Sequence, residues 1–146
     1  MRFVALLAVL LAACATPPGT SPESKPEQPP VVPATPPRQE NIAIAGLMDS
    51  ARAEAAAGNL PGAAASLERA LRIEPRNPRL WHELARVRLK QGQHAQAESV
   101  AARSNSWAGD DKALRAENWR LIAESRQARG DTDGAQAALE QAGASR

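Results

Sequence analysis

Cysteine, aromatic residues and net charge are all scarce in this 146-residue chain, and each shortage excludes a class of protein. One cysteine cannot form an intramolecular disulfide framework or a cysteine-rich zinc site. A formal net charge of +2 argues against a dedicated nucleic-acid binder, which would carry a strongly basic face. Aromatic residues make up 3% of the chain and tyrosine is absent, so the chain cannot build a base-stacking platform.

The N-terminus has the pattern of a signal peptide. Met1 and Arg2 form a short positive segment, and residues 3–13 are an unbroken apolar run. A helix that spans a membrane needs about 20 apolar residues, so this run is too short to be a transmembrane anchor. Residues 1–13 are therefore predicted to be a cleaved signal peptide.

The apolar run ends in Leu11-Ala12-Ala13-Cys14, which resembles the lipobox of bacterial lipoproteins. The resemblance implies cleavage before Cys14 and lipidation of its sulfur and of the new amino terminus, which gives stable membrane anchoring. Ala15 follows the cysteine, where an Asp in such lipoproteins often signals inner-membrane retention; its absence favours the outer membrane. The alternative is ordinary secretion that leaves a free cysteine.

A proline-rich segment follows, and residues 14–40 are interpreted as a lipidated cysteine with a disordered tether. Residues 15–40 hold nine of the 12 prolines and no aromatic residue. Such a segment cannot bury enough apolar surface to offset its ordering entropy. As a polyproline-like spacer it reaches at most about 80 Å. It is either an ordinary linker of the kind that lipoproteins carry, or a linker that is long because the domain must meet a target away from its own membrane.

Residues 41–146 contain an internal repeat. Gly58, Gly92 and Gly130 mark the same point in three units. Trp81 and Trp119 precede the second and third glycines by the same distance. Small residues recur after each glycine, with Ala63, Ala97 and Ala135 at one shared place and Leu67, Ala101 and Leu139 at the next.

These features resemble the tetratricopeptide repeat, a 34-residue helix-turn-helix. The resemblance implies an all-α domain in which three repeats stack as a short right-handed solenoid. Six helices are predicted, at about 41–57, 60–73, 78–91, 94–104, 111–129 and 132–143. Glu54, Arg88 and Arg126 stand where the family often has Tyr. Trp107 lies in a four-residue insertion and is expected to be a local packing plug.

No constellation of catalytic residues is found, and the protein is predicted to be neither an enzyme nor a cofactor or metal binder. His82 and His94 are the only histidines; they fall on different predicted helices and are expected to be surface polar residues. Asp111 and Asp131 stand at predicted helix starts, where carboxylates favour the helix dipole, so capping is the expected role.

The first helices of tetratricopeptide repeats typically line a concave groove that binds peptides or partner proteins. Helical spacing projects a set of side chains onto that groove. The candidates are Met48, Arg52, Arg79, His82, Arg86, Leu89, Lys90, Glu117, Arg120, Glu124 and Gln127. The paired asparagines of the chaperone-binding clamp are absent, so capture of a chaperone C-terminus is not expected. The alternative is a solvated face with an accidental charge bias.

The combination of lipobox, proline-rich tether and three repeats resembles the small outer-membrane lipoproteins of pseudomonads that activate a class A, bifunctional penicillin-binding protein. The resemblance implies a monomeric, lipid-anchored activator in the periplasm whose partner is that peptidoglycan synthase. One alternative is an assembly lipoprotein for a pilus or secretion complex, similar to a pilotin. Another is a module that binds peptidoglycan or acts on it directly.

Overall fold

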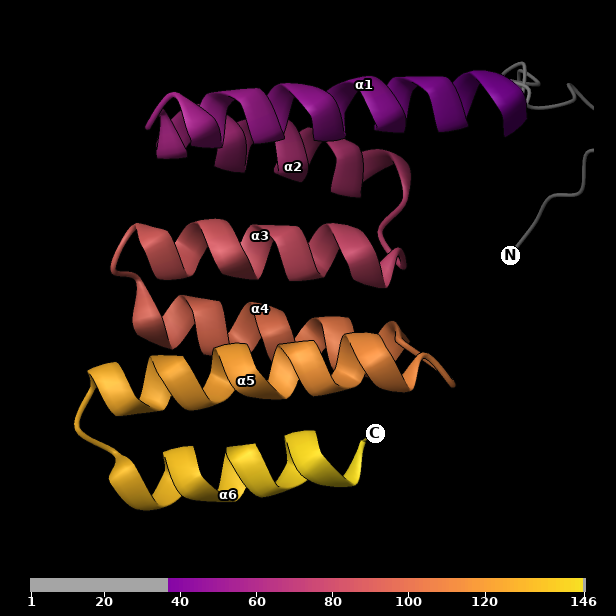
Figure 1. The fold of residues 1–146 in the computed structure, drawn as a ribbon. Helices are drawn as coiled ribbons and strands as arrows, with labels where there is room; N and C mark the ends of the chain where they lie inside the picture. Colours follow the sequence, from indigo (N-terminus) through magenta and orange to yellow (C-terminus); the bar gives the residue numbers. More distant parts are fainter. Residues whose placement is uncertain (1–36, 146) are drawn as a thin grey trace, which may run out of the picture. The chain divides into compact units, whose positions relative to one another are not determined.

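The computed structural model describes residues 37–145, with side chains from residue 42 onward. The predicted signal peptide, Cys14 and most of the predicted tether lie outside the described residues. Six helices follow one another: α1 (Pro37–Ala56), α2 (Leu60–Ile73), α3 (Pro78–Lys90), α4 (His94–Trp107), α5 (Lys112–Ala128) and α6 (Thr132–Ala144). Consecutive helices contact each other, and the three helix pairs stack in chain order (Figure 1). The prediction of an all-α fold with three helix pairs is confirmed.

Short polar side chains begin the second helix of the first and third pairs. The side-chain oxygen of Asn59 accepts a hydrogen bond from the Gly62 amide at 3.1 Å, and Asp131 accepts one from Gly134 at 2.9 Å. Each cap satisfies one of the amides that a helix start leaves without an intrahelical partner. Gly58 precedes the first of these caps with φ +80°, a backbone angle that side-chain-bearing residues rarely adopt. These residues end one helix and start the next, as predicted.

Small residues lie where helices pack most closely. Ala63 and Ala97 are fully buried and Ala135 nearly so, which permits close approach of the paired helices. Two clusters form the core, one around Leu67 between the first and second pairs and one around Ile122 between the second and third. Trp81 packs against the first cluster and Trp119 against the second, so each is partly buried between helix pairs. Leu139, in contrast, is 49% exposed, because the described residues contain no seventh helix to cover it.

Two helix boundaries differ from the prediction. Helix α1 begins at Pro37 rather than near residue 41, since proline is well tolerated in the first turn, where its missing N–H costs no hydrogen bond. Helix α4 continues to Trp107 instead of ending at Ser104. The insertion therefore adds most of a helical turn, and the chain leaves the helix only near Gly109, where φ is +51°.

Trp107 does not act as the predicted packing plug. Its side chain is 40% exposed at the end of α4, and the Arg76 guanidinium lies 5.1 Å from its ring centroid. Trp81 has a similar neighbour, since the Arg103 guanidinium lies 5.1 Å from its centroid. Cation–π contacts of this kind stabilise by about 0.5–1 kcal/mol at exposed sites. The first contact joins α4 to the α2–α3 turn, and the second joins α4 to α3.

The charged residues in place of the family's tyrosine form polar links between helices. Glu54 accepts a hydrogen bond from the Ser66 hydroxyl at 3.0 Å. Arg88 on α3 pairs with Glu68 on α2 at 2.5 Å, and Arg126 on α5 pairs with Glu98 on α4 at 2.7 Å. The two arginine pairs therefore join each repeat to the one before it.

Candidate functional site

A pocket of about 190 Å³ lies between α1 and α3, the first helices of two neighbouring repeats. Its floor comes from the buried side chains of Ala51, Leu67 and Val87, which are 3%, 1% and 5% exposed. Ala55 and Ala56 form part of its wall at the end of α1. These alanines leave the space open because they are the smallest side chains that a helix carries without loss of propensity. We call this space the α1–α3 pocket.

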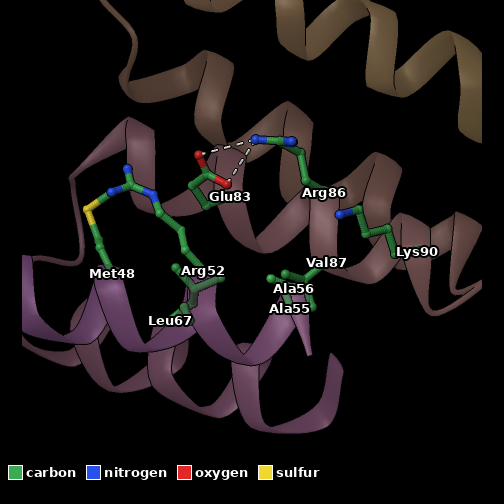
Figure 2. Close-up of a pocket in the computed structure, with 10 residues that line it drawn as sticks. Met48, Arg52, Ala55, Ala56, Leu67, Glu83, Arg86, Val87 and Lys90 are labelled. Carbon is green, nitrogen blue, oxygen red and sulfur yellow. Dashed lines mark hydrogen bonds and ion pairs between the residues drawn. The ribbon is translucent and has the colours of Figure 1, made fainter. Parts of the chain in front are cut away.

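Charged side chains surround the apolar floor of the α1–α3 pocket (Figure 2). Arg52 comes from α1, and Glu83, Arg86 and Lys90 come from α3. Glu83 and Arg86 are three residues apart and form an ion pair at 3.2 Å. Among the described residues, no carboxylate lies within ion-pair distance of Lys90. The lining thus holds three cations and one anion around an apolar floor.

A second, shallower depression continues from the pocket between α3 and α5. It is lined by His82, Arg86, Glu117, Arg120, Leu121 and Glu124. Arg86 lines both spaces, so the pocket and the depression adjoin at this side chain, and we call the two together the groove along the first helices of the three repeats. Arg120 and Glu124 are exposed on α5. The depression is therefore lined mainly by charged side chains, whereas the pocket has an apolar floor.

His82 is buried, which shows that the prediction of a surface histidine is wrong. It is 9% exposed, and its Nδ1 lies 2.8 Å from the Oδ1 of the fully buried Asn118. The Asn118 amide group donates to Ser104 at 2.7 Å and to Asn105 at 3.0 Å. Asn118 Oδ1 is then the acceptor, so the His82 Nδ1 carries the proton.

The other ring nitrogen of His82 faces the α3–α5 depression. Its Nε2 lies 3.7 Å from a carboxylate oxygen of Glu117, which is 55% exposed. The Ser104 hydroxyl extends the network on the other side by donating to the Pro78 carbonyl at 2.8 Å. His82 therefore has a structural role in the interior and presents one polar atom to the groove.

Most of the predicted groove residues are brought together. Met48, Arg52, Arg86 and Lys90 line the α1–α3 pocket. His82, Glu117, Arg120 and Glu124 line the depression with Arg86.

Three candidates line neither space. Arg79 forms an ion pair with Asp111 at 3.0 Å and borders a separate hollow at the α2–α3 turn. Leu89 is half-buried and Gln127 is exposed, and neither belongs to the pocket or the depression.

Sequence reasoning missed Glu83, Val87 and the two wall alanines. Glu83, Val87 and Lys90 recur at spacings of four and three residues, so they share one face of α3 and the spacing could have indicated them. Ala55 and Ala56 carry no such signal, because alanine is abundant throughout the repeats.

Two kinds of site are absent from residues 37–145, a metal-binding cluster and a membrane-spanning helix. No group of three or more His, Cys, Asp or Glu side chains in this part of the chain could hold a metal ion. No described helix has the length and apolar character needed to cross a bilayer. The groove offers cations, carboxylates and an apolar pocket, which are suited to holding a polypeptide segment.

Comparison with known proteins identifies the fold and the family. A model of the tetratricopeptide repeat matches residues 54–117, and a search of curated proteins found no match. Together with the three stacked helix pairs, this match makes the chain a tetratricopeptide-repeat protein. Among solved structures, the globular C-terminal domain of P. aeruginosa LpoP is 46% identical, with a TM-score of 0.68; the match covers 69% of this chain and 95% of that one. The chain belongs to the LpoP family.

Proposed function

We propose that this protein is a non-catalytic outer-membrane lipoprotein that binds and activates a class A penicillin-binding protein in the periplasm. The observation that carries the proposal is the 46% identity to the C-terminal domain of P. aeruginosa LpoP over nearly the whole of that domain. Lipoproteins of this kind stimulate glycan polymerisation and crosslinking by the synthase. The described helices are proposed to be the part of the protein that contacts the synthase.

The N-terminal sequence supports the proposed location. Cys14 is the chain's single cysteine and directly follows the apolar run, where a lipobox requires it. The proline-rich residues 15–40 then suit a spacer that carries the domain away from the outer membrane toward a synthase in the opposite membrane. Lipid anchor, tether and repeat domain together form the architecture that the activity needs.

The groove supports a protein partner. It joins an apolar pocket to a charged depression through Arg86. Protein interfaces commonly combine a buried apolar anchor with a polar rim, and arginine is enriched at their centres. The proposed contact surface is therefore the concave side formed by α1, α3 and α5.

The proposal is tested by reconstituting the lipid-free mature protein with its purified class A penicillin-binding protein. Glycan-chain elongation is measured with fluorescent lipid II, with and without the protein. Wild-type protein should raise the rate, and Arg86→Glu with Arg120→Glu should lose the stimulation at nearly unchanged thermal stability. Exposed charges contribute only about 0–1 kcal/mol to stability, whereas like charges placed face to face at an interface cost several kcal/mol.

A matched control reverses two exposed cations outside the groove, Arg69→Glu with Lys112→Glu. This variant should stimulate the synthase like the wild type. Stimulation that survives the groove reversal but disappears in the control would place the contact surface outside the groove. A wild-type protein that binds the synthase without any change in rate would refute the activator function.

A further inference from the structure

We infer that the α1–α3 pocket selects its partner by receiving one medium-sized apolar side chain of a polypeptide segment that carries a carboxylate within two residues of it. The inference rests on the proposed function, since it describes the segment by which the partner enters the groove. The pocket's volume, its buried floor and the sign of the surrounding charge each define one property of that segment.

The volume defines the size of the side chain. An engineered protein cavity of about 150 Å³ accommodates benzene, and the α1–α3 pocket holds about 190 Å³. A Leu, Ile, Met or Phe side chain therefore fits. An alanine would leave most of the space unfilled, and the contacts with the floor would be lost.

The floor defines the polarity of the side chain. Leu67 and Val87 present carbon atoms to the pocket and are almost completely shielded from solvent. A polar side chain placed here would lose its water without gaining a hydrogen-bond partner from the floor. An apolar side chain gains the full benefit of burial, so the pocket favours aliphatic and aromatic residues.

The charge around the opening defines the neighbours of the anchoring side chain. Glu83 is already paired with Arg86 at 3.2 Å. Arg52 is paired with Asp49 at 3.3 Å, so Lys90, which has no carboxylate within ion-pair distance among the described residues, supplies the excess of positive charge around the opening. A carboxylate next to the anchor reaches these cations without entering the floor, whereas a lysine there would be repelled.

The continuity of the groove defines the class of the occupant. Arg86 borders both the pocket and the α3–α5 depression, so a chain anchored in the pocket continues past His82 and Arg120. A polypeptide can place its anchor in the pocket and its polar backbone and side chains along this charged path. A lipid acyl chain has no polar groups to match the depression.

The experiment pans a displayed library of twelve-residue random peptides on the mature, lipid-free protein. A parallel panning uses Ala56→Trp, in which an exposed wall position of the pocket is filled by a large ring. Peptides enriched only on the wild type should carry Leu, Ile, Met or Phe within two residues of Asp or Glu. Ala137→Trp changes another exposed alanine, on α6 and away from the pocket; it is the control and should enrich the same peptides as the wild type.

Enriched peptides are then measured by fluorescence anisotropy. Changing the anchor to alanine should weaken binding about 30-fold, because about 2 kcal/mol of apolar burial is lost. Lys90→Glu should weaken the binding of the acidic peptides about 10-fold, and this loss of affinity should shrink as the salt concentration is raised. If Ala56→Trp fails to fold, as judged by circular dichroism, Ala55→Leu replaces it.

The outcomes separate the inference from the proposed function. Pocket-dependent peptides of the expected chemistry, with no stimulation of the synthase by the wild-type protein, would support the inference and refute the function. A synthase that responds equally to wild type and Ala56→Trp, with no pocket-dependent peptide, would refute the inference alone. Binding of sodium dodecanoate that Ala56→Trp abolishes, without peptide enrichment, would make the pocket a lipid site and also refute it.

Discussion

Replacing Asn118 with alanine should destabilise the repeat domain by about 3 kcal/mol. Asn118 is fully buried and makes hydrogen bonds to His82, Ser104 and Asn105 at 2.7–3.0 Å. Its removal leaves the His82 Nδ1–H and the Asn105 side-chain oxygen without these partners. Each buried polar group left unpaired costs about 1–3 kcal/mol, and the space left by the amide adds to the loss.

This loss is large on the scale of the whole domain. Domains of this size are stable by about 5–15 kcal/mol in total, and 3 kcal/mol corresponds to a drop in Tm of about 10–20 °C. Urea unfolding followed by circular dichroism at 222 nm measures the change. The control is Gln127→Ala, which removes an exposed amide on the same helix and should change stability by less than about 0.5 kcal/mol.

A double-mutant cycle shows whether the effect comes from the hydrogen bond. His82→Ala alone leaves Asn118 Oδ1 unpaired, so the double variant should lose at least about 1 kcal/mol less than the sum of the single losses. Strictly additive losses, or an Asn118→Ala protein as stable as Gln127→Ala, would show that the buried network does not stabilise the fold as reasoned.

Three further predictions concern the anchor, the tether and one turn. The Cys14→Ser protein should be lost from the outer-membrane fraction, because a hydroxyl does not replace the thiol as lipid acceptor. Continued fractionation with the outer membrane would contradict the proposed anchor. Deleting residues 18–36, which precede α1, should lower activity in cells but leave the domain's melting temperature and its stimulation of a purified synthase unchanged. Equal loss of activity in both assays would make the tether itself a binding element. Gly92→Ala should cost about 1 kcal/mol, measured by urea unfolding, since Gly92 has φ +72° and a Cβ there meets no neighbour, so the cost is backbone strain alone.

The repeat architecture could be predicted because its signals are local and occur three times. Ala63, Ala97 and Ala135 recur at one place relative to a glycine, and close helix packing requires small residues there. The end of α4 could not be predicted in the same way. Residues 105–107 contain no helix breaker, so the helix continues across the insertion although the repeat pattern ends.

The candidate site was predictable where the side chains are charged and follow helical spacing. Arg52, Arg86 and Lys90 do line the α1–α3 pocket. The burial of His82 was not predictable, because it depends on Asn118, which is 36 residues away and belongs to another repeat. The periodicity of a single helix identifies a face but does not reveal which polar partner the next repeat brings to it.

The two junctions between repeats differ in the kind of force that holds them. At the second junction, α5 is fixed near its middle by Asn118 and near its C-terminal end by Arg126, both through directional polar contacts with the preceding pair. The first junction rests mainly on the apolar cluster around Leu67, with the partly exposed Arg88–Glu68 ion pair beside it.

Apolar contacts are not directional, so they permit small sliding movements that hydrogen bonds of fixed geometry resist. We therefore expect the second and third repeats to move as one rigid body and the first repeat to shift against them. The α1–α3 pocket lies at the first junction, between the first and second repeats. A small shift of the first repeat would therefore adjust the width of the pocket to the side chain that enters. Hydrogen–deuterium exchange would show this as faster exchange in α1 than in α5, and uniform protection of both helices would contradict it.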